Sequence, residues 1–143
     1  MKNDFRSSCP ITTALDIVGD KWTLVIVKQM LLEGKKTFKD FSECDEAIAT
    51  NILSTRLKTL ESQGFVRKEN LPHNKKTKLY ILTEKGLSLA PIVVELALWA
   101  SSGVCGDGHT VAYDARMEVL LKDKEQGIQN IINTYKDMHW VEA

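Results

Sequence analysis

The feature that most constrains the fold is a change in apolar spacing near residue 65. Before that point apolar residues recur three or four positions apart, which is typical of amphipathic helices. Residues 65–71 and 78–82 instead resemble two strands, separated by a basic, turn-rich stretch at 72–77. Helical spacing returns after Thr83. The sequence therefore predicts a β-hairpin with a basic tip, flanked on both sides by helices.

Four helices are predicted before the hairpin. The first begins at Pro10, and the second spans 21–33, with Asp20 as its cap and Gly34 as its stop. A capping box of Thr37 and Asp40 starts a short third helix. The fourth helix spans 49–63, and its expected buried stripe contains Ile52, Leu53, Leu57 and Leu60.

Helices are also predicted after the hairpin. The first is capped by Thr83 and runs to about residue 100, with a kink or break expected at Pro91. The glycine-rich stretch 101–110 is expected to be a flexible connection, and a last helix spans 115–138, weakened in its middle by Gly127. That last helix either extends a dimer interface or folds back within its own subunit.

Composition excludes several classes of protein. No uninterrupted apolar run approaches the roughly 20 residues that span a bilayer, and the polar N-terminus is unlike a signal peptide. We therefore expect a cytoplasmic protein with no membrane partner. The three cysteines are far apart and form no CxxC, so neither a disulfide framework nor a zinc site is predicted.

The net charge of zero conceals an uneven distribution. The chain has 19 Lys and Arg against 19 Asp and Glu. Residues 50–85 nevertheless contain eight bases and three acids, a net charge of +5, and the remainder of the chain carries −5. Because phosphate attraction acts over a Debye length of about 10 Å, a neutral protein with one basic face can still bind DNA.

The order of elements is that of a winged helix-turn-helix, a mainly α fold with a small hairpin wing. In that fold the second helix of the motif enters the major groove and the wing lies along the DNA backbone. Arg56 has two candidate roles, because it can bind a phosphate or pair with an acid such as Glu61 or Asp40. The candidate DNA-binding residues are Thr37, Lys39, Thr50, Asn51, Ser54, Thr55, Arg56, Lys58, His73, Asn74, Lys75, Lys76 and Lys78.

An ordered set of segments resembles the HxlR-type transcriptional regulators, a MarR-like family. They are Cys9-Pro10, residues 16–24, 38–41, 53–61, 64–66 and 80–86, then Pro91 and Trp99. The resemblance implies a homodimer on a palindromic operator in double-stranded DNA, with dimerisation through the N- and C-terminal helices. It also implies a regulator, more commonly a repressor, without enzymatic activity. We expect residues 1–102 to form the DNA-binding domain, and 103–143 a helical extension at the dimer interface.

Cys9 precedes the helix that begins at Pro10. The positive end of a helix dipole favours the thiolate, and Arg6 is expected to add to this effect. The resemblance implies that Cys9 senses oxidants or electrophiles; the alternative is an inert thiol at the dimer interface. Cys44 and Cys105 have no role that the resemblance assigns.

Other functions give different expectations. A regulator of the same fold could be controlled by a small aromatic ligand, bound between the last helices and the DNA-binding core, with Trp99 and Trp140 as candidate lining residues. An interaction module that does not touch DNA is disfavoured by the basic segment 50–85. An enzyme is disfavoured because the sequence has no Gly-rich phosphate loop, HExxH or GxSxG. No cofactor and no metal is expected.

Overall fold

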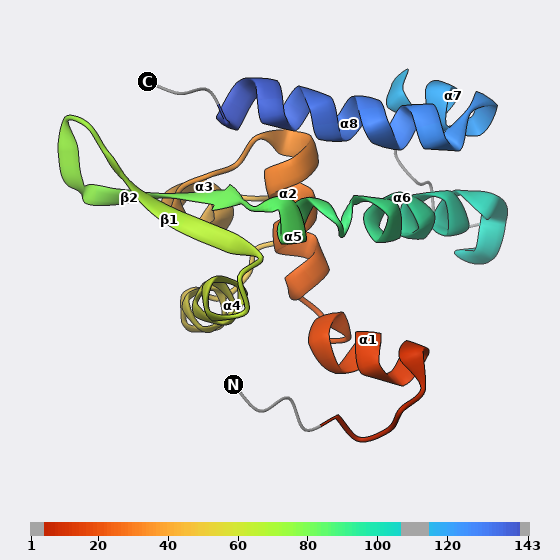
Figure 1. Cartoon of the computed structure of the whole chain (residues 1–143), viewed down its shortest axis with the longest axis horizontal. Coiled ribbons are helices and arrows are strands. Elements are labelled where there is room, and N and C mark those ends of the chain that lie inside the picture. The colour runs from red at the N-terminus through yellow and green to blue at the C-terminus, as the bar shows by residue number, and fades with distance from the viewer. Residues whose placement is uncertain (1–4, 107–114, 141–143) are drawn as a thin grey trace.

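The structure is a computed structural model that describes residues 5–106 and 115–140, and it confirms the mainly helical fold with one hairpin (Figure 1). Four helices precede the hairpin, and the remaining helices follow it. The elements are α1 (Pro10–Val18), α2 (Thr23–Glu33), α3 (Phe38–Ser42), α4 (Thr50–Ser62), β1 (Val66–Leu71), β2 (Asn74–Leu82), α5 (Glu84–Leu87), α6 (Ala90–Trp99), the π-helical turn η1 (Ala100–Val104), α7 (Ala115–Lys122) and α8 (Lys124–His139).

Helix α2 is the centre of the core. Its residues Ile26, Val27 and Met30 are completely buried, and the helix contacts β2, α6 and α8. In Figure 1 the hairpin extends to one side of α2 and α6 to the other, while α8 crosses one end. One apolar helix therefore joins the DNA-binding half of the fold to the C-terminal helices.

The predicted helix caps are confirmed. Asp20 Oδ2 accepts hydrogen bonds of 3.0 Å from the backbone N–H groups of Trp22 and Thr23 at the start of α2. Gly34 ends α2 with a φ of 69°, a left-handed conformation that suits a residue without a Cβ. Thr37 and Asp40 form the expected capping box of α3.

The hairpin is tighter than predicted. Its antiparallel ladder runs from the pair Val66 and Leu82 to the pair Asn70 and Lys78, and an irregularity follows at Leu71. Strand β2 begins at Asn74, four residues earlier than the expected position 78. The reason is local: Asn74 Oδ1 accepts a 3.0 Å hydrogen bond from the backbone N–H of Lys76, and its amide donates to Thr77. This side chain therefore orders part of the stretch 72–77 that was predicted as a turn-rich tip.

The expected break near Pro91 occurs just before it. Helix α5 ends at Leu87 and α6 begins at Ala90, so Pro91 lies in the first turn of α6. Proline suits a first turn because the N–H that it lacks would have no helical partner there. Deeper in a helix its ring would clash with the carbonyl of residue i−4. The prediction of a flexible connection at 101–110 is wrong in its first part, because residues 100–104 form the helical turn η1 directly after α6. Residues 107–110 lie outside the described residues.

The single helix predicted at 115–138 is two helices. The chain breaks at Asp123, whose carboxylate accepts from the backbone N–H of Gln126 and caps α8. Gly127, expected to weaken the helix, is instead a packing position: a Cβ there would lie 2.5 Å from Leu120 Cδ2. Leu120, Ile131 and Tyr135 are buried within the chain. Helix α8 therefore folds back on its own subunit, against α2 and α6.

Two side chains at the C-terminal end of α8, Tyr135 and the C-cap residue Trp140, contact the base of the hairpin. The Tyr135 hydroxyl accepts a buried 2.8 Å hydrogen bond from the backbone N–H of Leu82, and Trp140 Nε1 donates to the Leu82 carbonyl at 2.9 Å. Lys136 pairs with Glu84 at 2.9 Å. Burial raises the pKa of Tyr135 to about 12, so the hydroxyl keeps its proton. The C-terminal helix thus helps to set where the hairpin leaves the core.

A long apolar segment remains partly uncovered. Glu84–Val104 has 21 residues and contains an 18-residue window with a mean hydropathy of 1.6, enough by length and composition to cross a membrane, although the sequence contains no unbroken apolar run of that length. The helix is interrupted between α5 and α6, and Val93 and Val94 are buried in the core. Its outer face carries Ile92, Leu96, Trp99 and Val104, all exposed.

Candidate nucleic-acid interface

Helix α4 has one apolar face and one polar face. Leu53, Leu57 and Leu60 are at most 2% exposed and anchor the helix to the core. The opposite face presents Thr50, Asn51, Thr55 and Lys58, which are exposed, whereas Ser54 is half-buried beside them. The Thr55 hydroxyl donates a 3.0 Å hydrogen bond to the Asn51 carbonyl, so it is held along the helix. The small polar side chains of this face suit close approach to base edges.

Arg56 does not lie on that polar face. Its guanidinium Nε is 3.2 Å from Asp20 Oδ2, and both side chains are only partly exposed. The expected partners Glu61 and Asp40 are therefore not the ones used. Asp20 caps α2 and pairs with α4 at the same time, so this carboxylate fixes the angle between the two helices. A pairing across 36 positions gives no signal in the sequence, because it depends on how the helices pack.

A groove separates α3 from the hairpin. It has a volume of about 510 Å³, and its lining includes Thr37 and Lys39 on one wall and Lys76 and Lys78 on the other. The groove has four further lining residues that were not predicted from the sequence, and they are Phe38, Ser42, Thr77 and Tyr80. The Thr37 hydroxyl oxygen already accepts a hydrogen bond from the backbone N–H of Asp40 in the cap of α3. Four of the predicted residues are thus brought together, and the lysines give the groove positive charge.

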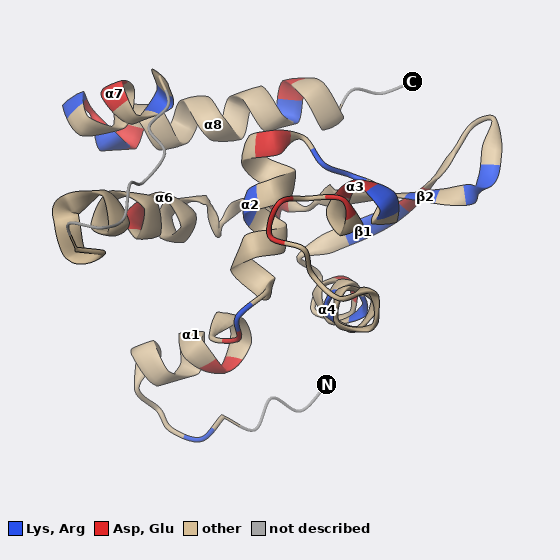
Figure 2. Ribbon diagram, turned by 180° about the vertical axis from the view of Figure 1, so that it is seen from behind, with Lys and Arg blue, Asp and Glu red and all other residues tan. Residues whose placement is uncertain are grey.

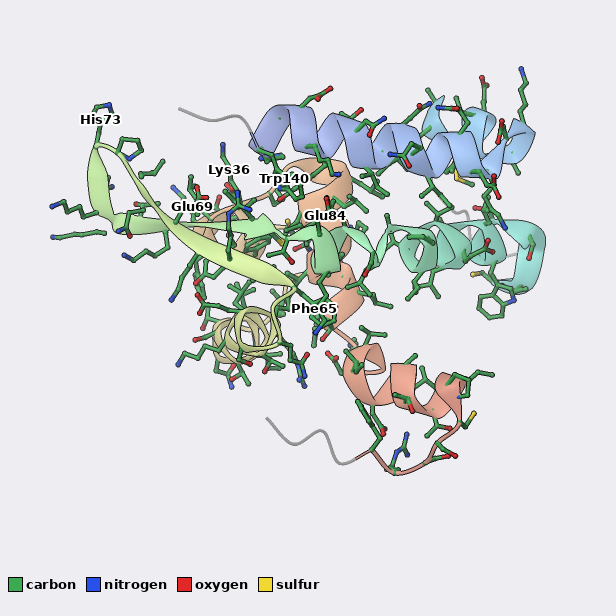
Figure 3. All side chains as sticks on the ribbon, in the orientation of Figure 1. Lys36, Phe65, Glu69, His73, Glu84 and Trp140 are labelled. Atoms are coloured by element: carbon green, nitrogen blue, oxygen red, sulfur yellow. The ribbon has the colours of Figure 1, made fainter. Side chains whose placement is uncertain are left out.

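The hairpin tip carries several exposed positive charges. His73 lies at the tip (Figure 3), and Asn74, Lys75, Lys76 and Lys78 are exposed beside it. Figure 2 shows Lys and Arg gathered on the hairpin and just before α3, with acidic residues in the turn between α3 and α4. The predicted tip residues therefore share one protruding surface.

At the base of the hairpin the basic side chains have partners, and two of these partners are acids already counted in the +5 of residues 50–85. Arg67 pairs with Glu69 at 2.9 Å, and Lys68 lies 3.8 Å from Glu61. Lys85 donates to the Gln63 carbonyl at 2.7 Å. Positive charge that can reach DNA is consequently concentrated at the tip, in the α3 groove and at Lys58.

The cysteines differ in environment. Cys9 is the exposed N-cap residue of α1, and the backbone N–H of Thr12, the Thr12 hydroxyl and the Ile11 N–H lower the pKa of its thiol. Arg6 does not contribute as expected, because it pairs with Asp16 at 2.6 Å. Burial raises the pKa of Cys44, and the nearby Glu33 carboxylate adds to this. Cys105 is exposed at the end of η1.

The fold and its polar helix face define a winged helix-turn-helix DNA-binding protein. The family model for the HxlR-like helix-turn-helix matches residues 17–105, and the chain belongs to this family. Curated relatives in this family are HTH-type transcriptional regulators.

Two relatives come from Bacillus subtilis (strain 168). The HTH-type transcriptional regulator YybR is 32% identical over 122 residues, which cover 85% of this chain and 92% of YybR. The HTH-type transcriptional regulator YodB is 33% identical over 112 residues, covering 78% of this chain and 98% of YodB. The C-terminal helices of this chain lie beyond residue 105, where the family match ends.

Solved structures support the same class. The redox regulator HypR in its oxidised form has a TM-score of 0.58 and 36% identity, over 66% of this chain and 96% of HypR. Quinone-bound YodB from B. subtilis has a TM-score of 0.54 and 30% identity, over 66% of this chain and 99% of YodB. This protein is therefore similar to regulators of which one is described as a redox regulator and one has been crystallised with a quinone.

Asp20 provides a test of the geometry at this interface. Burial raises the pKa of Asp20, but hydrogen bonds from Thr23 and Trp22 together with Arg56 outweigh this effect and lower the pKa. A lowered pKa in the folded state stabilises the fold above the unfolded pKa of about 4, and this stabilisation is lost as the pH falls through the folded value. We expect Asp20→Ala to lower the free energy of unfolding by about 1–2 kcal/mol at pH 7.

Chemical denaturation at pH 7 and pH 3 measures this effect. Asp20→Asn is the matched control, because it keeps a side-chain acceptor for the cap and removes the charge. The difference between its free energy of unfolding and that of the wild type should be smaller at pH 3 than at pH 7. An equal difference at both pH values would show that the carboxylate charge does not contribute.

Proposed function

We propose that this protein is a homodimeric transcriptional repressor that binds a palindromic operator and releases it when Cys9 is oxidised or modified by an electrophile. The observation that carries the proposal is the shared exposure of the α4 polar face and the basic hairpin tip on the family's DNA-binding fold. The proposed contacts are those predicted from the sequence, except that Arg56 acts by holding α4 through Asp20. The direction of regulation rests on the family resemblance.

The two groups of side chains have different proposed roles. Asn51 and Thr55 project from α4 and contact base edges in the major groove, while Lys75 and Lys76 contact phosphates of the flanking backbone. Lys39 and Lys78 face each other across the α3 groove and contact a further stretch of backbone. This division assigns sequence preference to α4 and salt dependence to the hairpin.

Substitution should separate the two roles. Lys75→Ala with Lys76→Ala should weaken operator and random DNA alike and reduce the slope of log K against log salt by about two, because each phosphate contact contributes about 0.9. Asn51→Ala should change the preferred bases at one position and leave the slope unchanged. Binding titrations at several salt concentrations measure both, and identical effects of the two changes would contradict the assignment.

The dimer is supported by the uncovered apolar surface. Trp99 is 66% exposed and Leu96 48% exposed on α6, and Ile11 is 71% exposed on α1. Figure 1 shows α1 standing apart from the remainder of the fold. A second copy of the chain covers these side chains, and it also explains the apolar character of Glu84–Val104 without a bilayer. Residues 103–143 form a C-terminal extension in this proposal, and the exposed Leu121 of α7 lies at the edge of the dimer interface.

Polar substitution of α6 tests the dimer. We expect Leu96→Ser with Trp99→Ser to raise the dimer dissociation constant at least tenfold, because two large exposed apolar groups lose their burial in the partner. Sedimentation equilibrium measures the constant. Phe38→Ser removes a 37% exposed phenyl group on α3, outside the proposed interface, and should leave the constant unchanged. A monomeric wild type, or equal effects of the two variants, would rule out this interface.

Thiol chemistry tests the proposed signal. Diamide treatment should weaken operator binding of the wild type at least tenfold, whereas Cys9→Ser should retain its affinity within threefold. Cys105→Ser keeps Cys9 and should respond like the wild type, which controls for a general effect of exposed thiols. If Cys9→Ser loses affinity to the same extent after diamide, Cys9 is not the sensor.

A further inference from the structure

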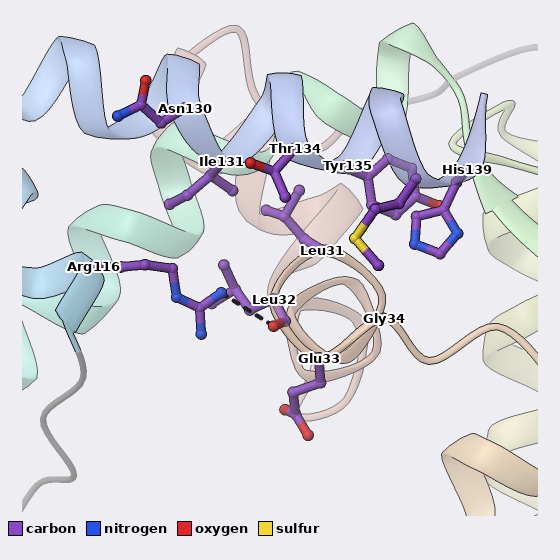
Figure 4. Close-up of a pocket in the computed structure, with 11 residues that line it drawn as sticks. Leu31, Leu32, Glu33, Gly34, Arg116, Asn130, Ile131, Thr134, Tyr135 and His139 are labelled. Atoms are coloured by element: carbon purple, nitrogen blue, oxygen red, sulfur yellow. Dashed lines mark hydrogen bonds between the residues drawn. The ribbon is translucent and has the colours of Figure 1, made fainter. Parts of the chain in front are cut away.

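A cavity of about 280 Å³ lies between the C-terminal end of α2 and the helices α7 and α8 (Figure 4). Leu31, Ile131 and Tyr135 are buried side chains in its wall, and Met138, 65% exposed, lies at its rim. A dry apolar cavity of about 150 Å³ accommodates benzene. This cavity therefore has room for one substituted ring or two fused rings. Neither Trp99 nor Trp140, the expected aromatic lining, is part of it.

Three polar side chains around the cavity, those of Glu33, Arg116 and Asn130, have partners. Glu33 pairs with Lys28 at 2.6 Å, and Arg116 Nη1 donates to the Leu32 carbonyl at 3.0 Å. The Asn130 side-chain oxygen accepts from Gln126 at 2.7 Å. Burial lowers the pKa of His139, so its imidazole is neutral at neutral pH. A charged ligand would lose hydration on entering a wall of buried apolar side chains, whereas an uncharged one avoids that cost.

One wall residue connects the cavity to the DNA-binding surface. The ring of Tyr135 lines the cavity, and its hydroxyl holds the backbone N–H of Leu82. Leu82 is the last residue of β2 and pairs with Val66 of β1. Trp140 holds the Leu82 carbonyl from the same end of α8. A shift of α8 relative to α2 therefore acts on both backbone polar groups at the base of the hairpin.

We propose that this cavity binds a small uncharged aromatic molecule and that its occupation moves the hairpin through Tyr135 and Leu82, which changes DNA affinity. The ligand acts by binding one position of α8 more tightly than another, as any such coupling requires. The change in DNA affinity rests on the proposed function, whereas binding in the cavity does not. The site also gives the C-terminal helices, which lie beyond the family match, a role of their own.

Calorimetry with the full chain and 2-naphthol tests the site. We expect saturable binding by the wild type, and at least tenfold weaker binding by Thr134→Trp, in which the indole fills the cavity. Asn133→Trp adds the same ring at the neighbouring exposed position, outside the lining, and should bind within twofold of the wild type. The anion 2-naphthoate should bind at least tenfold more weakly than 2-naphthol.

Three results would overturn the site: no binding of 2-naphthol by the wild type, equal binding by Thr134→Trp, or a preference for 2-naphthoate. Circular dichroism of each variant establishes that it is folded. The three measurements use no DNA, so they decide the site even if the proposed function fails.

The coupling is tested by operator titrations with and without saturating 2-naphthol. We expect a change of at least fivefold in operator affinity for the wild type and no change for Tyr135→Phe, which keeps the ring in the wall and loses the hydroxyl. Trp140→Phe removes the other hydrogen bond to Leu82 and should also reduce the change. An unchanged affinity at saturation would refute the coupling, and failure to bind any DNA would refute it together with the proposed function.

Discussion

The fold's DNA-binding character depends on how α4 is packed. Leu53, Leu57 and Leu60 recur at helical spacing and are buried, so the residues between them must face outward. Asn51, Thr55 and Lys58 are consequently exposed on one face. Burying each leucine contributes roughly 1.5–3 kcal/mol, which is large compared with the contribution of any polar contact on the outer face. The core therefore determines the orientation of the proposed recognition surface.

A second constraint fixes α4 and the hairpin relative to α2. Asp20 caps α2 and pairs with Arg56 of α4, and Tyr135 and Trp140 hold Leu82 at the end of β2. The hydrogen bonds of Asp20, Tyr135 and Trp140 satisfy backbone polar groups that would be costly to leave unpaired in a partly buried site. The two proposed DNA-contacting elements are thus both tied to the core, one through the N-terminal end of α2 and the other through α8.

The local features were predictable because they depend on neighbouring residues. The caps at Asp20 and Thr37, the stop at Gly34 and the two strands all follow from short-range chemistry. Features that depend on tertiary approach were not predictable. The partner of Arg56 and the packing of Gly127 against Leu120 arise only once separate helices meet. The break at Asp123 has a local cause, the cap that its carboxylate gives to the Gln126 N–H, which the apolar spacing alone did not indicate. For the site, the exposed tip lysines were expected, but their groove with α3 and the ion pairs at the base of the hairpin were not.

The neutral total charge is compatible with DNA binding because its positive part is local. Selection of bound sequences from a random DNA pool tests the central claim most directly, since it requires DNA binding, two-fold symmetry and the placement of α4 together. The account predicts enrichment of an inverted repeat whose half-sites are centred about one helical turn, roughly 34 Å, or a multiple of it apart. A pool that shows no enrichment, or an enriched sequence without two-fold symmetry, would contradict it.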